Sequence, residues 1–315
     1  MSLKVSILGI GSMGKNHLRV MSMLKGVTVV KLFDSDEGAL KVLSQQYDVP
    51  YTLDATEAIE NVDAVFIVTP TSTHFDYFNL CVGKVNHVFI EKPLAETYVK
   101  AQKIKALANE NGMFVQCGFI ERFNPVVVEL KKILKTNKVI NTDFFRTNRL
   151  SSRITDVDVV LDLMIHDIDL ALYLNGPVQD LQAYGKKENG LISFASAFFK
   201  HDNGSLSRII GSRMTEKKMR SIQVTTENSY IDAELMSKEL RVHKQSALTI
   251  DTDDSYIVSS LEQQIEVMPQ EALLVELQAF FSRCNGEQFE VLPDVDAGVE
   301  SLRICELVLE SIKNA

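Results

Sequence analysis

Over the first 118 residues, short β-branched runs alternate with longer stretches in which apolar positions recur every three or four residues. This alternation is typical of parallel strands joined by crossover helices. It predicts strands at residues 4–10, 27–33, 50–51, 63–68, 86–90 and 113–117, and a clear helix at 98–109. We therefore expect a doubly wound α/β domain in this part of the chain.

The pattern changes after about residue 120. It predicts helices at 124–135 and 159–174, a strand at 138–147, and further strands at 191–199, 205–213 and 221–225. Asn203-Gly204 is a strong hairpin signal between two of these strands. Helices are expected at 269–284 and 295–313, the second capped by Asp294. We predict two domains, residues 1–119 and 120–315, the second with an antiparallel or mixed sheet.

Composition narrows the class of protein. The 315 residues are 45% apolar and 24% charged, which is ordinary for a globular protein. The net charge of −9 argues against nucleic acid as a partner. The four cysteines form no C-x-x-C pair, which suits a reducing cytoplasm. The apolar run at 64–68 is too short to span a membrane, and residues 5–8 are too short for the apolar part of a signal peptide. We expect a cytoplasmic protein with no membrane partner.

A glycine-rich loop follows the first predicted strand and opens a helix: Gly9-Ile10-Gly11-Ser12-Met13-Gly14. Such a loop brings backbone N–H groups at a helix start close to a pyrophosphate. Asp34 ends the second strand, where its carboxylate can accept hydrogen bonds from ribose hydroxyls. The segment Asp34-Ser35-Asp36-Glu37 has no cation to neutralise a 2′-phosphate, which favours NAD over NADP. The alternatives are a purely structural turn or another nucleotide, such as S-adenosylmethionine.

Two further segments leave strands at the same predicted sheet edge. Thr69-Pro70-Thr71 is expected to contact nicotinamide and ribose. His74 is equally consistent with a capping or packing residue. Glu91-Lys92-Pro93 ends the next strand, and the proline favours an extended Lys92 that projects toward the ligand. The alternative for Lys92 is a solvated surface charge.

Asp162, His166 and Asp169 lie at positions i, i+4 and i+7 of an otherwise apolar predicted helix. Polar groups on one face of such a helix cost free energy unless they are paired, so this face is expected to meet a polar cleft or a hydrogen-bond network. Histidine suits the role of a base for a hydroxyl group. The alternatives are a core histidine paired with Asp162, or a metal site. No third ligand is evident at helical or loop spacing, so no metal is predicted.

Residues 122–153 are basic, in contrast to the acidic whole. Lysines at helical spacing are typical of a solvated face, whereas arginines can hold a phosphate or carboxylate through paired hydrogen bonds. Both interpretations stay open for this segment. Its basic residues are Arg122, Lys131, Lys132, Lys135, Lys138, Arg146, Arg149 and Arg153.

Together, the glycine loop, Val68-Thr69-Pro70-x-x-x-His74, Glu91-Lys92-Pro93 and Asp162-x-x-x-His166 resemble the Gfo/Idh/MocA family of oxidoreductases over nearly the whole chain. The resemblance implies an NAD-binding Rossmann domain and an α/β domain with a large, mostly antiparallel sheet that mediates oligomerisation, as a homodimer or homotetramer. It implies substrate binding between the domains. It also places Lys92, Asp162 and His166 at catalytic positions. Met164 departs from the glycine that many members have there.

The segments Glu121-Arg122-Phe123-Asn124-Pro125 and 160–169 resemble the UDP-N-acetylglucosamine 3-dehydrogenase branch of the family. This implies NAD-dependent oxidation of a ring hydroxyl of a nucleotide-linked sugar. The predicted substrate contacts are Lys92, Arg122, Asn124, Arg149, Arg153, Asp162 and His166. His166 is the leading proton acceptor, Lys92 polarises the hydroxyl, and Asp162 orients the pair, although the first two roles are interchangeable on the sequence alone. The alternatives are a polyol or monosaccharide dehydrogenase and a non-catalytic NAD-binding sensor.

Overall fold

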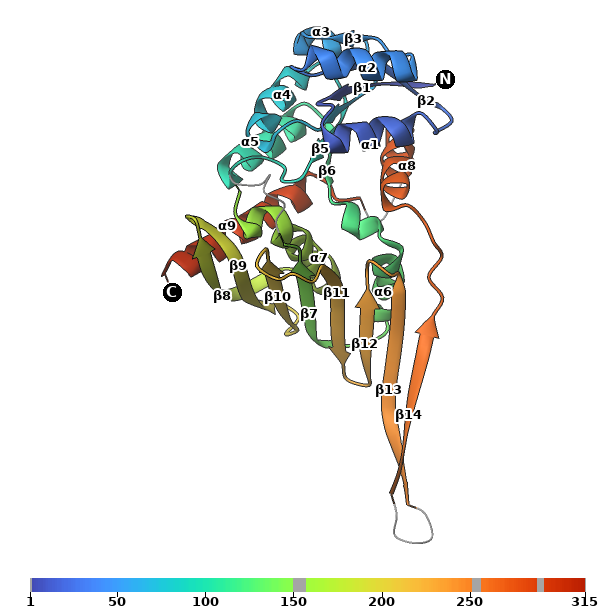
Figure 1. Cartoon of the computed structure of the whole chain (residues 1–315), viewed down its shortest axis with the longest axis vertical. Helices are drawn as coiled ribbons and strands as arrows, with labels where there is room; N and C mark the ends of the chain where they lie inside the picture. The colour runs from blue at the N-terminus through green and yellow to red at the C-terminus, as the bar shows by residue number, and fades with distance from the viewer. Residues whose placement is uncertain (1, 150–156, 251–255, 288–291, 315) are drawn as a thin grey trace. The chain divides into compact units, whose positions relative to one another are not determined.

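The computed structural model describes residues 2–149, 157–250, 256–287 and 292–314 (Figure 1). Two compact units emerge, each discontinuous in sequence. The first comprises Met1–Ile120 and Glu271–Arg303, and the second comprises Glu121–Gln270 and Ile304–Ala315. Helix α8 (Ala272–Cys284) and the start of α9 (Val295–Asn314) thus group with the first unit.

The first unit contains a six-stranded parallel sheet, which confirms the predicted doubly wound fold. Its strands are β1 (Leu3–Leu8), β2 (Val27–Phe33), β3 (Tyr51–Thr52), β4 (Ala64–Ile67), β5 (His87–Glu91) and β6 (Phe114–Gly118). The strand order is β3-β2-β1-β4-β5-β6, and every pairing is parallel. The order reverses between β1 and β4. Such a switch point is where open α/β sheets bind ligands, beyond the carboxyl ends of the strands.

Helices connect the strands of this sheet and complete its core. They are α1 (Ser12–Met21), α2 (Glu37–Tyr47), α3 (Ala55–Ala58), η1 (Thr71–Thr73), α4 (His74–Cys81) and α5 (Tyr98–Glu110). Helix α8 adds Leu277 and Phe280 to the same hydrophobic core as α1 and the sheet. The Phe280 ring contacts Phe66 and Phe89 edge-on, with centroids 4.9 and 5.8 Å away. The core of the first unit therefore needs residues from both ends of the chain.

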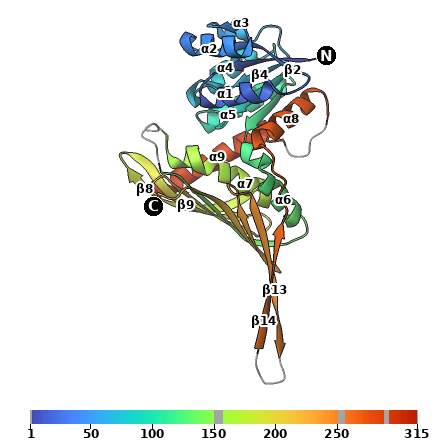
Figure 2. The ribbon, with the colours of Figure 1, turned by 45° about the vertical axis from the view of Figure 1, so that its right-hand side comes forward.

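The second unit contains an eight-stranded sheet, antiparallel except for one pair, which confirms the implied architecture. Its order is β14-β13-β12-β11-β7-β10-β9-β8, and among its described residues only β7 and β10 pair in parallel. Lys244 of β13 pairs with Ser229, the first residue of β12, and beyond this pair β13 and β14 continue as a two-stranded ribbon (Figure 2). The strands are β7 (Val139–Thr147), β8 (Val178–Glu188), β9 (Leu191–His201), β10 (Leu206–Ser212), β11 (Met219–Thr226), β12 (Ser229–Glu234), β13 (Glu239–Ile250) and β14 (Tyr256–Ile265).

The helical elements of the second unit include η2 (Ile120–Phe123), which begins at the boundary, α6 (Pro125–Leu134), η3 (Val160–Met164) and α7 (Ile165–Asn175). The single helix predicted at 159–174 is wrong in one respect, because its first turn, η3, is a π-helix that leads into the α-helical α7. Across the part of the chain that the structure describes, no helix is long and apolar enough to cross a membrane.

Candidate active site

The glycines of the first loop have different surroundings. Gly9 has φ +93°, and a Cβ there would lie 2.6 Å from backbone atoms of Val68. At Gly14 a Cβ would lie 2.0 Å from the carbonyl oxygen of Gly9. These two positions therefore require glycine for packing of the loop. A Cβ at Gly11 would meet no atom of the described residues within 4 Å, so the Gly11 backbone faces open space that a ligand can enter.

Helix α1 begins directly at this open position. Its N-cap residue Gly11 offers no side-chain hydrogen bond, and the first turn, which contains Ser12 and Met13, has no acidic residue. The first N–H groups of a helix lack intrahelical acceptors and carry a partial positive charge. The start of α1 therefore suits a pyrophosphate.

Asp34 connects the end of β2 to the glycine loop. Its Oδ2 accepts a hydrogen bond from the Ile10 backbone N–H at 2.8 Å, and its Oδ1 accepts one from Asp36 N–H at 3.0 Å. A carboxylate has about four acceptor positions, so Asp34 can stabilise the loop and still accept a hydrogen bond from a ligand hydroxyl. The sequence predicted the ligand contact but not the bond to Ile10.

A cavity of about 470 Å³ lies beside this loop. It brings together predicted cofactor contacts from three strand ends, while Thr71 opens η1 without lining it. Tyr77 on α4 also lines the cavity, and its ring packs edge-on against Phe33 with centroids 5.5 Å apart. No motif marked Tyr77 in the sequence. The predicted residues in the lining are Gly9, Gly11, Asp34, Ser35, Thr69 and Pro70.

His74 lies within the protein instead of lining this cavity. It is 1% exposed, with Nδ1 2.9 Å from the Pro93 carbonyl oxygen and Nε2 2.9 Å from that of Thr69. Burial lowers the pKa of His74, although both carbonyl groups oppose this shift. These contacts match the packing alternative for His74.

Glu91 is similarly held by neighbouring groups. Its Oε1 accepts a hydrogen bond from His17 Nε2 at 2.8 Å, and its Oε2 accepts one from the Lys92 backbone N–H at 3.2 Å. The peptide bond between Lys92 and Pro93 is cis, and the Lys92 side chain is half-buried. His17 was not recognised from the sequence, although it lies three residues after Gly14.

In the second unit, Asp162 lies in η3 and His166 lies in the first turn of α7, where it is half-buried. Asp162 Oδ2 accepts a hydrogen bond from Arg213 Nη2 at 2.7 Å. The Arg213 side chain is 2% exposed, whereas that of Asp162 is 24% exposed. Arg213, which the sequence did not single out, therefore fixes a carboxylate that still reaches solvent.

Met164 lies between these two residues in the sequence and packs against Gly211 of β10, which has no side chain. A Cβ at Gly211 would lie 2.3 Å from Met164 Cγ. Met164 is fully buried, so the missing side chain at Gly211 provides the space for it. The departure from glycine at position 164 is thus accommodated by a glycine on the adjacent strand.

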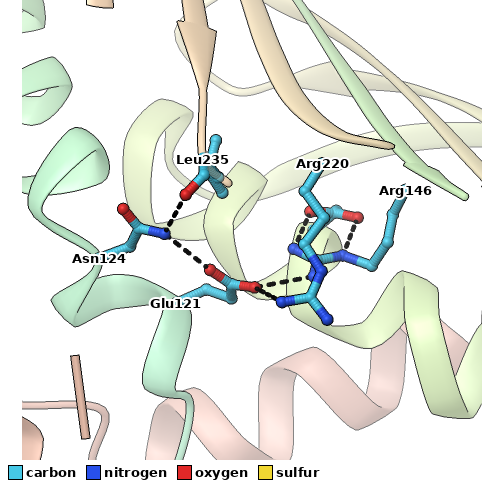
Figure 3. Close-up of polar contacts among 6 residues, drawn as sticks. Glu121, Asn124, Arg146, Arg220 and Leu235 are labelled. Atoms are coloured by element: carbon cyan, nitrogen blue, oxygen red, sulfur yellow. Dashed lines mark hydrogen bonds and ion pairs between the residues drawn. The ribbon is translucent and has the colours of Figure 1, made fainter. Parts of the chain in front are cut away.

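A buried charge network joins Glu121 and Arg146 (Figure 3) and includes Asp167, the residue after His166. Arg146 Nε and Nη2 each donate to Asp167 at 2.8 Å, and Arg146 Nη1 donates to Glu121 at 2.8 Å. Arg220 adds a longer bond of 3.3 Å to Glu121. Burial opposes ionisation of Glu121, but Arg146 holds the Glu121 pKa below its ordinary value, whereas burial raises the pKa of Asp167. The network fixes the start of α7 to β7 and η2.

The predicted substrate contacts near residues 122–153 have other partners. Arg122 Nε and Nη2 donate to buried Asp169 at 2.8 and 2.6 Å. Asn124 caps α6, accepting a hydrogen bond from Val126 N–H at 3.1 Å and donating to Glu121 and to the Leu235 carbonyl (Figure 3). Arg149 is exposed and pairs with Glu216.

Arg153 lies outside the described residues. Asp169 is 1% exposed, so its pairing with Arg122 places it in a structural network. Within the described ranges, no group of three or more histidine, cysteine, aspartate or glutamate side chains is arranged to hold a metal ion.

Most of the chain matches known family models. Residues 3–119 match the oxidoreductase family with an NAD-binding Rossmann fold, and residues 140–232 match the GFO/IDH/MocA C-terminal domain. Among curated proteins, the chain is similar to UDP-N-acetylglucosamine 3-dehydrogenase of Acidithiobacillus ferrooxidans, with 26% identity over 89% of this chain and 88% of that protein. It is also similar to scyllo-inositol 2-dehydrogenase (NAD(+)) of Bacillus subtilis, with 22% identity over 94% and 90% of the two chains.

Solved structures share the fold over the full length. The structure of the Acidithiobacillus ferrooxidans enzyme has a TM-score of 0.89 at 22% identity, covering 100% of this chain and 99% of that one. An oxidoreductase from Agrobacterium radiobacter, in complex with NAD+, L-tartaric acid and magnesium, has a TM-score of 0.87 at 18% identity, covering 100% and 97%. At these identities the likeness establishes the arrangement of strands and helices.

Proposed function

Because the chain belongs to the Gfo/Idh/MocA family of NAD-binding oxidoreductases, we propose that it oxidises a ring hydroxyl of a nucleotide-linked sugar. A UDP-linked N-acetylhexosamine or its uronate is the leading substrate, since one relative is named for oxidising UDP-N-acetylglucosamine. The observation that carries the oxidoreductase function is the open Gly11 at the start of α1 beside the Asp34 carboxylate. We assign cofactor binding to the first unit and the substrate contacts other than Lys92 to the second.

When bound, NAD supplies the carbon that accepts the hydride. The first N–H groups of α1 would hold its pyrophosphate, and Asp34 would accept a hydrogen bond from its adenosine ribose. Asp36 and Glu37 follow Asp34 and repel a 2′-phosphate, so NAD is preferred to NADP. Thr69 and Pro70 complete the lining of this site.

Proton transfer is assigned to His166. A neutral imidazole accepts a proton near neutral pH, which suits a base for a sugar hydroxyl. Asp162, oriented by Arg213, positions the hydroxyl and His166, while the Lys92 ammonium polarises the hydroxyl oxygen. Arg122 and Asn124 are left out of this assignment, because their polar groups already bond within the protein.

The second candidate is a dehydrogenase of a free polyol or monosaccharide. It is favoured by the likeness to scyllo-inositol 2-dehydrogenase. A test is NADH formation with a panel that contains UDP-N-acetylglucosamine, its uronate, inositols and free monosaccharides. Turnover of a UDP-sugar alone supports the leading substrate, and turnover of inositols alone supports the second. No turnover of any compound by a protein that binds NAD tightly would instead indicate a sensor.

We also propose that the protein is a homodimer or homotetramer formed through the second unit. Tyr184 of β8 and Phe198 of β9 lie on one face of the sheet and are 54% and 53% exposed. Exposed aromatic residues of this kind mark association surfaces. Sedimentation of Phe198→Glu beside the natural protein tests this face.

The four cysteines are free thiols, which suits the cytoplasmic location that we propose.

A further inference from the structure

Two buried histidines contact the Glu91–Pro93 segment from different elements of the first unit. His17, on α1, is 0% exposed and donates from Nε2 to Glu91 at 2.8 Å. His74, at the start of α4, is 1% exposed, with Nδ1 2.9 Å from the Pro93 carbonyl. The residue between these anchor points is Lys92. Both histidines therefore act on the backbone that carries the proposed substrate lysine.

The Glu91 carboxylate is held at both oxygens. His17 holds Oε1, and the Lys92 backbone N–H donates to Oε2 at 3.2 Å. Gly118, at the end of β6, borders the same carboxylate, because a Cβ there would lie 2.9 Å from Glu91 Oε2. Glu91 therefore joins α1, β5 and β6 at the edge of the sheet where the cofactor cavity lies.

His74 makes a second contact at this edge. Its Nε2 is 2.9 Å from the carbonyl oxygen of Thr69, a residue that lines the cavity. A neutral imidazole has one N–H, so the ring donates to one of the two carbonyls at a time. With the proton on Nδ1, His74 holds the Pro93 carbonyl and packs against Thr69.

Stability alone does not account for a histidine at position 17. Its ring lies among aromatic side chains, with centroids 5.6 Å from Phe66 and 5.2 Å from Phe89. Its Nδ1 is buried with no hydrogen-bond partner among the residues that the structure describes. A buried polar atom without a partner costs free energy, and an apolar side chain would fill this place without that cost. We therefore attribute the polar pair to its effect on the position of the Glu91 carboxylate and not to a gain in stability.

We propose that His17 and His74 are positioning residues that clamp the Glu91–Pro93 segment and so fix Lys92 at the cofactor edge of the first unit. The catalytic consequence rests on the function proposed above for Lys92. The clamp itself is a property of the protein without substrate. The two parts can therefore be measured separately.

The test compares His17→Leu, which removes the donor, with His17→Gln, whose amide N–H can replace Nε2. Phe280→Leu is the matched control, because it disturbs the same aromatic core without a polar change. Hydrogen exchange of the 91–96 backbone, measured without ligands, should rise in His17→Leu and return toward normal in His17→Gln. His74→Leu should raise exchange of the same segment. Phe280→Leu should leave this segment protected.

Turnover provides the second measurement. His17→Leu is expected to lower kcat by about 10- to 100-fold, as small displacements of catalytic groups do, with NAD affinity nearly unchanged and with recovery in His17→Gln. In a Lys92→Ala background, His17→Leu should cause no further loss, because both act through one side chain. Unchanged exchange in His17→Leu would overturn the clamp. Raised exchange with normal turnover would refute the catalytic consequence of the clamp, whereas normal turnover of Lys92→Ala itself would refute the role proposed for Lys92.

Discussion

Replacing Arg146 by methionine removes the central cation of the buried network and leaves Glu121 and Asp167 without their main partner. Arg146 is 2% exposed and makes three hydrogen bonds of 2.8 Å to these carboxylates. Breaking a buried ion pair from one side costs about 3 to 5 kcal/mol, so we expect a loss of this size in the free energy of unfolding at pH 7. Arg208→Met is the matched control on the adjacent strand β10. Its pair with Asp143 is partly exposed, with side chains 39% and 19% accessible, and should contribute about 1 kcal/mol or less.

The loss should also depend on pH. In the natural protein the lowered Glu121 pKa adds stability above the unfolded-state pKa of about 4.3, and this contribution is lost as the pH falls. Without Arg146, burial raises the pKa of both carboxyl groups, so the folded variant binds protons more readily than its unfolded chain. The loss in unfolding free energy, relative to the natural protein, should therefore be greatest at neutral pH and shrink toward about pH 4 to 5. Hydrogen exchange of β7 and α7 at increasing urea reports the second unit alone. A loss in unfolding free energy no larger than that of Arg208→Met, or a loss that does not depend on pH, would refute the reasoning.

Three further outcomes are expected. His166→Ala should lower kcat by about 10² to 10⁴ with little change in the NAD dissociation constant, and near-normal turnover would exclude His166 as the proton acceptor. Calorimetric titration should show NAD binding at least about tenfold tighter than NADP, or about 1.4 kcal/mol, with the preference reduced in Asp34→Ala, whereas equal affinities would contradict the role of the acidic segment. Gly211→Ala should destabilise the second unit by about 1 to 3 kcal/mol, because the added Cβ overlaps Met164 Cγ. Thermal unfolding should show partial recovery with Met164→Ala in the same chain, and full tolerance of Gly211→Ala alone would show that Met164 moves aside freely.

The elements that were predicted well depend on local patterns. Strand β2 extends over Val27–Phe33 as predicted, and the glycine loop leads from β1 into the first turn of α1. Strand β8 was missed because most of its residues are exposed, with Ala183 alone classed as buried, so it lacks clear alternation of apolar and polar residues. The π-helical turn at Val160–Met164 has no recognisable local signal, since its apolar residues also fit an α-helix.

The charged contacts were hard to predict for a different reason. Arg122 lies 47 positions before Asp169, and Arg213 lies 51 positions after Asp162. Only the folded chain determines which arginine meets which carboxylate, whereas composition merely shows that both are present. The basic segment was therefore open to interpretation as an anion site, although Arg122 and Arg146 neutralise buried carboxylates of the same unit.

The discontinuous first unit has a consequence for biosynthesis. Leu277 and Phe280 of α8 belong to the same core as Phe66 and Phe89 of the central strands. A ribosome must translate residues 121–270 before it reaches α8. Domains generally fold as units during synthesis, the N-terminal one first, but here the parallel sheet of residues 3–118 receives α8 only after residues 121–270 have been made. We therefore expect the aromatic surface that α8 covers to stay exposed in the nascent protein while residues 121–270 are translated.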